Sequence, residues 1–379
     1  MGREELASWL RLSLTPGIGN TAGRKLLAAF GLPVDVFRQT PDALRQVATD
    51  AQVQALLREP ADLPRLVDQT LEWLQGTDNH GATRRILTLG DAGYPAPLLE
   101  TADPPLMLYL LGAPAFDLTQ LDRSIAIVGS RNPTSQGVEN ARAFARAFGE
   151  AGITVVSGLA LGIDGAAHEG ALQAAQGSSG FATVAVVGTG LDRVYPAKHR
   201  DLAHRIAAQG LIVSEYALGT PPLNQNFPKR NRIIAGLCSG TLVVEAALKS
   251  GSLITARLAS EQGREVFAIP GSIHSPQARG CHALIRQGAK LVESVNDVLE
   301  ELRFGVAAPA AARASATATD SAPEPALLRE MGFDPVSLDA LCARTGYSAA
   351  DLQAKLLELE LDGSVARLPG GLFQRVALG

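Results

Sequence analysis

Glycine, serine and arginine follow three short apolar segments, at the points where each would turn into a helix. These turns read Gly129-Ser130-Arg131, Ser157-Gly158 and Gly188-Thr189-Gly190. Glycine lets the backbone come close to a ligand, serine adds a hydroxyl donor, and the planar guanidinium of arginine matches phosphate oxygens. A single loop of this kind is ordinary tight-turn chemistry, but three of them with Arg131 favour a site for a phosphate-bearing ligand.

A second cluster carries the densest positive charge of the central part of the chain. Lys229, Arg230 and Arg232 stand close together at the start of an expected helix. Cations at a helix start oppose the helix dipole, so the cluster suggests a bound anion or an acidic partner. Phe227 beside them offers a face on which a nucleic-acid base can stack. The alternative is a solvated basic turn with one buried phenylalanine.

Other polar residues are expected at the same edge. Ser250-Gly251-Ser252 with Thr255, and Pro270-Gly271-Ser272, follow two later apolar segments and can line the same pocket. Glu245 either orients an arginine or acts as a capping carboxylate, and the sequence does not separate the two.

Asp164 and His168 are four residues apart and would share a helix face. A cap at a helix N-terminus together with a packing histidine is favoured over an acid/base pair.

The elements that must position these residues alternate between strand and helix. IAIVG, ITVVSG, TVAVVGTG, LIVSEY, TLVVEAA and EVFAIPG are rich in valine and isoleucine, and helical stretches separate most of them. This pattern predicts an α/β fold with a Rossmann-like, doubly wound and mostly parallel sheet. In such a sheet ligands bind beyond the carboxyl ends of the strands, which is where the glycine-rich loops would lie.

Several of these motifs recur together in one family. G-S-R, S-G-L-A-x-G-I-D-x-x-A-H from Ser157 to His168, G-T-G, F-P-x-R-N-R and E-A-x-x-x-S-G-S-x-x-T-A from Glu245 to Ala256 stand in the order found in the DNA-processing protein A (DprA/Smf) family. The chain resembles that family over essentially the whole central part. An ordered set of this kind is more diagnostic than any one of its motifs.

The resemblance implies a function without bond chemistry. It implies a single-stranded DNA-binding protein, not an enzyme, that protects incoming DNA and helps load the RecA recombinase in natural transformation. It also implies a homodimer formed through the Rossmann-like domain, and no cofactor. The predicted DNA-binding residues are Gly129, Ser130, Arg131, Ser157, Gly158, Gly188, Thr189, Gly190, Phe227, Lys229, Arg230 and Arg232.

Two smaller units are expected beside the central domain, which we place at residues 83–305. Residues 1–82 form a helical domain, in which Pro16-Gly17-Ile18-Gly19 is either the turn of a helix-hairpin-helix (SAM-like) motif or a purely structural hairpin. Residues 306–322, rich in alanine, predict a flexible linker. Residues 323–379 follow the helix and hairpin order of a winged helix.

The predicted second helix of the winged helix is acidic. Ser348 to Asp362 carry one lysine against four carboxylates. Phosphate would repel such a helix, so we expect it to contact protein or to pack structurally.

Composition limits the alternatives. The net charge of −4 argues against a general positive field for duplex DNA, so an anion site must be local. No signal core and no apolar run of about 18 residues is visible, which predicts a cytoplasmic protein without membrane contact. Cys238, Cys281 and Cys342 show no metal-binding spacing and are expected to be core residues, so no metal is predicted.

One enzymatic alternative stays open. Ser239-Gly240-Thr241 invites comparison with the lysine-decarboxylase-like phosphoribohydrolases, which use a P-G-G-x-G-T-x-x-E loop. Here Glu245 follows Thr241 by four residues instead of three, and the preceding P-G-G is missing. A NAD-dependent enzyme is disfavoured further, because the first loop lacks the glycine fingerprint.

Overall fold

A computed structural model gives the fold of the chain. The described residues are 1–76, 81–114, 116–175, 182–304, 326–332, 334–368 and 370–375. The linker predicted at residues 306–322 lies outside them. The division of the chain after residues 82, 305 and 322 stays a prediction.

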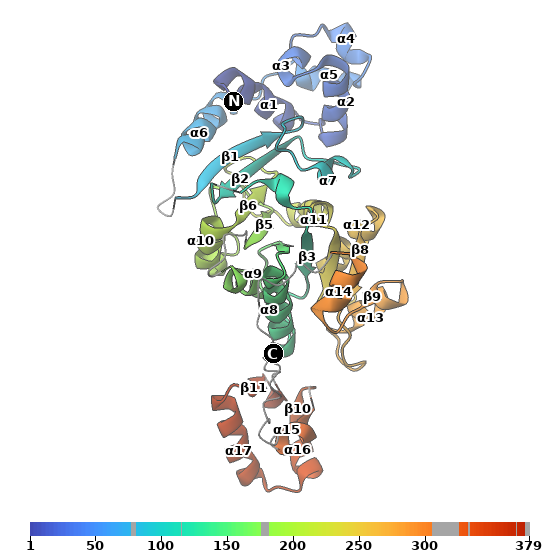
Figure 1. Cartoon of the computed structure of the whole chain (residues 1–379). Coiled ribbons are helices and arrows are strands. Elements are labelled where there is room, and N and C mark those ends of the chain that lie inside the picture. The colour runs from blue at the N-terminus through green and yellow to red at the C-terminus, as the bar shows by residue number, and fades with distance from the viewer. Residues whose placement is uncertain are drawn as a thin grey trace.

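Nine strands form one twisted sheet in the order β1-β2-β6-β5-β4-β3-β7-β8-β9 (Figure 1). The strands from β6 to β9 in that order run parallel. At the β6 edge, β2 pairs antiparallel with β6, and β1 pairs antiparallel with β2. The predicted mostly parallel α/β sheet is confirmed. The strands are β1 (Thr83–Thr88), β2 (Met107–Gly112), β3 (Ser124–Val128), β4 (Thr154–Ser157), β5 (Thr183–Val187), β6 (Leu211–Ser214), β7 (Gly240–Val243), β8 (Glu265–Ala268) and β9 (Lys290–Leu291).

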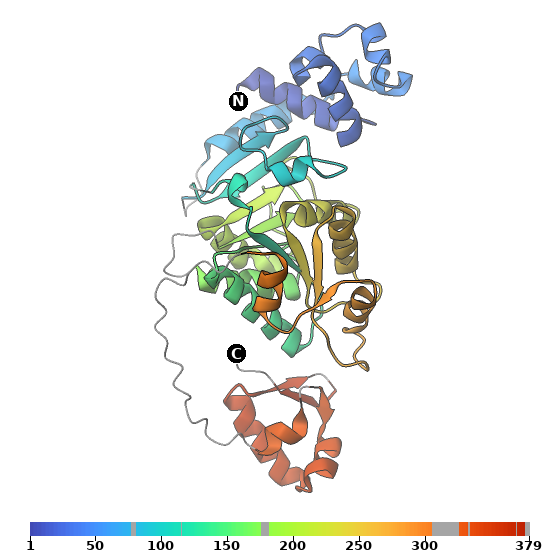
Figure 2. The same ribbon diagram turned by 45° about the vertical axis from the view of Figure 1, so that its right-hand side comes forward.

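Helices cover both faces of the sheet (Figure 2). Ile125 and Ile127 of β3 pack in one apolar layer with α8, α9 and α14, and Ala126 and Val128 pack in the other with α7, α11, α12 and α13. Because both faces are buried, the strands are almost continuously apolar. The elements are α7 (Ala96–Leu99), α8 (Ser135–Glu150), α9 (Ile163–Ala174), α10 (Arg200–Gln209), α11 (Asn226–Leu237), α12 (Gly251–Glu261), α13 (Arg279–Arg286), α14 (Val295–Glu301) and the 3-10 helices η1 (Leu118–Gln120) and η2 (Ala197–His199).

The strand order reverses between β3 and β7. From β3 the chain adds β4, β5 and β6 on one side, and then returns to add β7, β8 and β9 on the other. The loops that leave β3 and β7 therefore diverge, which opens a crevice at the carboxyl ends of these two strands. The sheet topology thus places Gly129-Ser130-Arg131 opposite the loop that contains Ser250.

The N-terminal helices share a hydrophobic core with one end of the sheet. Leu6 and Trp9 belong to the same apolar cluster as Tyr109 of β2 and Ile212 of β6. The rings of Trp73 and Tyr109 meet edge to face at 6.1 Å. None of the helices in the described ranges is long and apolar enough to cross a membrane. The N-terminal helices are α1 (Arg3–Leu14), α2 (Asn20–Phe30), α3 (Pro33–Val36), α4 (Pro41–Arg45), α5 (Asp50–Leu56) and α6 (Leu63–Gln75).

A polar cluster, which we call the α11 clasp, joins these helices to the sheet. Arg232 on α11 donates from Nε to Asp103 at 3.0 Å and from Nη2 to Glu215 at 2.5 Å. Asn20, the first residue of α2, donates from Nδ2 to the same two carboxylates, at 3.1 and 2.8 Å. The turn before α2 is therefore docked on protein, which favours the structural alternative for Pro16-Gly17-Ile18-Gly19.

The C-terminal unit is a winged helix with its own core. Leu327, Leu341, Leu352 and Phe373 are buried in one cluster. The predicted helices and hairpin are present, and a short strand, β10, completes a three-stranded sheet in the order β10-β12-β11. The elements are α15 (Ala326–Met331), β10 (Val336–Ser337), α16 (Leu338–Thr345), α17 (Ala349–Leu361), β11 (Val365–Leu368) and β12 (Leu372–Arg375).

The clasp should contribute measurably to stability. Arg232→Ala leaves the carboxylates of Asp103 and Glu215 without their counter-charge, and only 16% of the Glu215 side chain is exposed. We expect the free energy of unfolding, measured by urea denaturation, to fall by about 2 kcal/mol. The control is Arg257→Ala, which breaks an exposed pair with Glu261 on α12 and should change stability little. If Arg232→Ala and Arg257→Ala lowered the free energy of unfolding equally, the stabilising role of the clasp would be contradicted.

Candidate functional site

A cleft of about 490 Å³ lies at the carboxyl ends of β3 and β7. We call it the switch-point cleft. It is lined by residues from the segments 128–132, 160–164, 224–234 and 247–255, and by Gln277. The last three segments contain or lead directly into the first residues of helices α9, α11 and α12, so three helix N-termini converge here. The positive dipole ends of these helices favour an anion.

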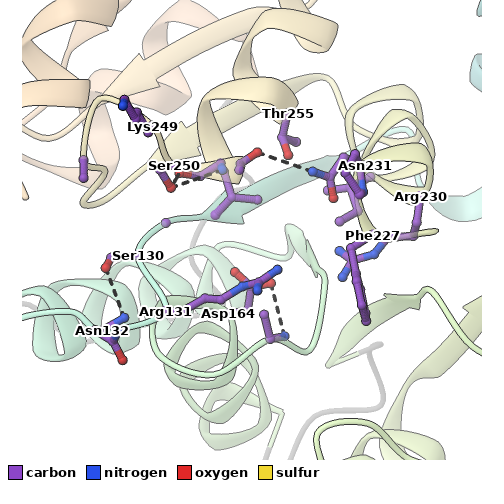
Figure 3. Close-up of a pocket in the computed structure, with 18 of the residues that line it drawn as sticks. Ser130, Arg131, Asn132, Asp164, Phe227, Arg230, Asn231, Lys249, Ser250 and Thr255 are labelled. Atoms are coloured by element: carbon purple, nitrogen blue, oxygen red, sulfur yellow. Dashed lines mark hydrogen bonds between the residues drawn. The ribbon is translucent and has the colours of Figure 1, made fainter. Parts of the chain in front are cut away.

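The loop after β3 brings an arginine into the cleft. At Gly129 a Cβ atom would lie 2.6 Å from Cγ1 of Ile163, so only glycine allows this close packing. The hydroxyl of Ser130 accepts a hydrogen bond from the backbone N–H of Asn132 at 3.1 Å, which shapes the turn. Figure 3 shows Arg131 reaching from this loop toward α11. Its guanidinium carbon lies 5.9 Å from the ring centre of Phe227. All three predicted residues of this loop line the cleft.

The loop after β4 supports the cleft from beneath. Ser157 is fully buried, and its hydroxyl donates to the carbonyl oxygen of Ile127 at 2.6 Å. The carbonyl oxygen of Gly158 accepts a hydrogen bond from Nη2 of Arg230 at 2.8 Å. Neither Ser157 nor Gly158 belongs to the cleft lining. Their place in the site is to hold other residues.

Arg230 and Asp164 form the charged floor of the cleft. Only 5% of Arg230 and 7% of Asp164 is exposed. Burial lowers the pKa of Arg230 to about 10, although the charge of Asp164 opposes that change. Burial also raises the pKa of Asp164, against the opposing effects of Arg230 and of hydrogen bonds from the N–H groups of Ala160 and Gly158. Each charge therefore offsets part of the desolvation cost of the other.

The loop after β5 packs against Phe227. A Cβ atom at Gly188 would lie 3.2 Å from the Phe227 ring, and the carbonyl oxygen of Gly188 accepts a hydrogen bond from Asn226 at 3.1 Å. Thr189 is buried, and the N–H of Gly190 donates to the carbonyl oxygen of Thr220 at 3.1 Å. The predicted residues of this loop are outside the cleft lining, so they support the site indirectly.

The cluster at the start of α11 divides between three environments. Phe227 is half-buried and Arg230 is buried, and both line the cleft. Lys229 is exposed beside the cleft and is not part of its lining. Arg232 belongs to the α11 clasp, and its side chain is 14% exposed. DNA contacts by Lys229 and Arg232 stay predictions.

The structure adds residues to the site that the sequence reasoning missed. Lys249 lines the cleft directly before the first turn of α12, where Ser250 and Ser252 also lie. Asn231 donates from Nδ2 to the carbonyl oxygen of Gly251 at 3.4 Å and so links α11 to α12. A sequence signal existed for Lys249, because it is the cation closest to Ser250-Gly251-Ser252.

Glu245 acts as a capping carboxylate. Its two oxygens accept hydrogen bonds from the N–H of Thr134 at 3.0 Å and from the Thr134 hydroxyl at 2.5 Å. Thr134 is the N-cap of α8. Glu245 therefore ties the loop after β7 to the start of α8, and does not orient an arginine.

His168 is a packing residue. It is fully buried, and its Nδ1 lies 2.8 Å from the hydroxyl of Thr183, which itself donates to the carbonyl oxygen of Val155. Burial, together with the charge of His199, lowers the pKa of His168 to about 3. Asp164, the second residue of α9, accepts hydrogen bonds from the preceding loop. The pair is structural, as the sequence favoured.

The described part of the chain contains no group of three or more histidine, cysteine or acidic side chains arranged to hold a metal ion. Cys238 and Cys281 are buried, and Cys342 is half-buried.

Comparison with known proteins assigns the chain to a family. A family model described as DNA recombination-mediator protein A matches residues 85–303, which is more than half of the chain, and a model of the DprA winged helix domain matches residues 309–371. The chain therefore belongs to the DNA recombination-mediator protein A family.

Individual relatives agree with this family. Protein Smf of Escherichia coli is 41% identical over 89% of this chain and 86% of its own length. The structure of DNA processing protein A from Streptococcus pneumoniae is 36% identical, with a TM-score of 0.65, over 79% of this chain and 98% of that one. A structure that addresses the single-stranded DNA binding mode of the Helicobacter pylori protein is 30% identical, with a TM-score of 0.51, over 58% of this chain and 96% of that one.

The Gly158 position can be tested directly. A Cβ atom there would lie 1.7 Å from Nη1 of Arg230, and the buried guanidinium cannot move aside without leaving its hydrogen bond. We expect Gly158→Ala to lower the free energy of unfolding by about 1–3 kcal/mol. Gly251→Ala is the matched control, because a Cβ at Gly251 would meet nothing within 4 Å. If urea denaturation gave the two variants the same stability, the packing argument would be wrong.

The burial of His168 predicts a pH dependence. The folded protein binds a proton at His168 only near pH 3, whereas the unfolded chain binds one near pH 6.5. This histidine therefore contributes stability that is fully present above pH 6.5 and is lost as the pH falls toward 3, at up to about 1.4 kcal/mol per pH unit. In the unaltered protein the free energy of unfolding, measured by urea denaturation, should decline as the pH falls from 6.5 to 4. His168→Gln should make that decline smaller. If the free energy of unfolding fell equally with pH in the unaltered protein and in His168→Gln, the effect of burial on His168 would be contradicted.

Proposed function

We propose that this chain binds single-stranded DNA in the switch-point cleft. The observation that carries the proposal is the pairing of Arg131 with the half-buried ring of Phe227, at a point where three helix N-termini converge. The guanidinium and the helix N-termini suit phosphate, and the ring suits an unstacked base. The 30% identical protein from Helicobacter pylori, for which a single-stranded DNA binding mode is described, supports the same ligand.

The size and charge of the site favour a single strand over a duplex. A base can stack on Phe227 only after it has left its own helix, and a cleft of about 490 Å³ has room for nucleotides but not for a double helix. The net charge of −4 also disfavours a broad duplex-binding surface on electrostatic grounds. Binding of this kind depends on local cations and stacking.

We assign different roles to the residues of the site. Arg131 and Lys249 contact phosphates, and Phe227 stacks with a base. Ser130, Ser250 and Ser252 hold the loops that present backbone N–H groups. Arg230, with Gly158, Gly188 and the other glycines of the strand-end loops, keeps these groups in place. Lys229 contacts the strand from the rim, whereas Arg232 acts through the clasp.

The wider role follows from the family. As a recombination mediator without catalytic activity, the protein would protect incoming single strands and help load the RecA recombinase on them during natural transformation. It would act as a homodimer formed through its Rossmann-like domain. These three points rest on the family resemblance.

Arg131→Ala is the central test. The variant loses the cation that faces Phe227, so we expect its affinity for a fluorescein-labelled oligothymidylate to fall by about tenfold or more. The slope of log affinity against log salt concentration should decrease in magnitude by about 0.7, the value for one lost phosphate contact on a single strand. Fluorescence anisotropy over a series of salt concentrations measures both. Lys249→Ala should act in the same direction.

Arg146→Ala is the matched control for this test. It removes the same charge from an exposed position on α8, where Arg146 pairs with Glu150. Unchanged affinity in both Arg131→Ala and Lys249→Ala would refute the proposed site. The alternative function is that of a nucleotide hydrolase similar to the lysine-decarboxylase-like phosphoribohydrolases. It would be supported if the protein released free base from nucleoside monophosphates and Glu245→Ala abolished that release.

A further inference from the structure

A second aromatic ring stands beside the cleft and is largely exposed. Tyr195 lies in the loop between β5 and α10, outside the residues that line the cleft. Its ring centre is 5.5 Å from that of Phe227, with 34° between the ring planes. The exposed fraction of Tyr195 is 48%. Arg131, Phe227 and Tyr195 therefore form a continuous row that begins in the cleft and ends at the surface.

The loop that carries Tyr195 is held at several points. Leu191 is buried, and the carboxylate of Asp192 accepts a hydrogen bond from the N–H of Gly219 at 2.8 Å. On the other side of Tyr195, Nδ1 of His199 lies at hydrogen-bonding distance, 3.0 Å, from the carbonyl oxygen of Leu159 in the loop after β4. The loop thus presents the tyrosine ring in a defined position, which lowers the entropy cost of stacking a ligand on it.

The residues that follow Tyr195 in the sequence add positive charge. Lys198 and Arg200 are exposed, and neither has a carboxylate within 4.0 Å among the residues that the structure describes. Of the nearby carboxylates, Asp192 already interacts with Arg193 and with Gly219, and Asp201 lies in the first turn of α10. An exposed aromatic face followed by free cations is the arrangement that recognises a base with its phosphates.

We propose that Tyr195, Lys198 and Arg200 form a second nucleotide-binding step, which continues the path of single-stranded DNA out of the switch-point cleft. A base stacks on the exposed part of the Tyr195 ring, and the adjoining phosphates lie against Lys198 and Arg200. This inference rests on the proposed function of the cleft. It adds the direction in which the strand leaves, namely along the loop between β5 and α10.

The proposal is tested with oligothymidylates of two lengths, one of about 5 and one of about 15 nucleotides, in fluorescence anisotropy. The short strand can fill the cleft, and the long strand can also reach Tyr195. We expect Tyr195→Ala to weaken binding of the long strand by about tenfold and to leave the short strand almost unchanged. Tyr195→Phe, which keeps the ring, should bind both strands like the unaltered protein.

The cations give an independent measurement. Lys198→Ala combined with Arg200→Ala should reduce the magnitude of the salt slope by about 1.4 for the long strand, the value for two phosphate contacts, and leave the slope for the short strand unchanged. Arg146→Ala is again the control, because its charge is exposed far from this loop in sequence.

Different outcomes separate this proposal from the function on which it rests. If Arg131→Ala weakens binding of both strands while Tyr195→Ala weakens neither, the cleft binds DNA and the second step is refuted. If Tyr195→Ala weakens both strands equally, the tyrosine only supports Phe227 and the second step is also refuted. If Arg131→Ala and Lys249→Ala each leave binding of both strands unaffected, the proposed function itself fails.

Discussion

Arg230 holds the strand-end loops of this protein together. It begins on α11, crosses beneath the cleft and donates to the carbonyl oxygen of Gly158, while the charge of Asp164 offsets part of its burial cost. Asp164 in turn accepts hydrogen bonds from the N–H groups of Gly158 and Ala160. A buried cation of this kind is costly unless its partners are well placed, so the loop after β4 and the start of α11 must keep one relative position.

The remaining features of the site depend on that position. Helix α11 is held on its other side by the clasp of Arg232 with Asp103 and Glu215, so two arginines fix one helix. With α11 fixed, Phe227 lies against Gly188 and within reach of Arg131. The aromatic face is therefore pre-organised, which reduces the entropy lost when a ligand binds.

The proposed anion site is compatible with a chain of net negative charge, because positive potential is concentrated in one place. Helices α9, α11 and α12 begin around one cleft, where their positive dipole ends add to the charges of Arg131 and Lys249. The topology of the sheet produces this convergence, since β3 and β7 are neighbours at the point where the strand order reverses. The rest of the surface needs no excess of cations.

The sequence by itself determined the α/β sheet, the winged helix and the loops around the cleft, because apolar periodicity and glycine-rich turns are local signals. It did not determine which cations face the ligand. Residues two apart on a helix point about 200° apart, so Arg230 and Arg232 had to face different surroundings. Only the packed structure decided that one supports the cleft floor and the other joins α2 to the sheet. The approach of Tyr195 to Phe227 likewise depends on how two distant loops pack, which no local pattern encodes.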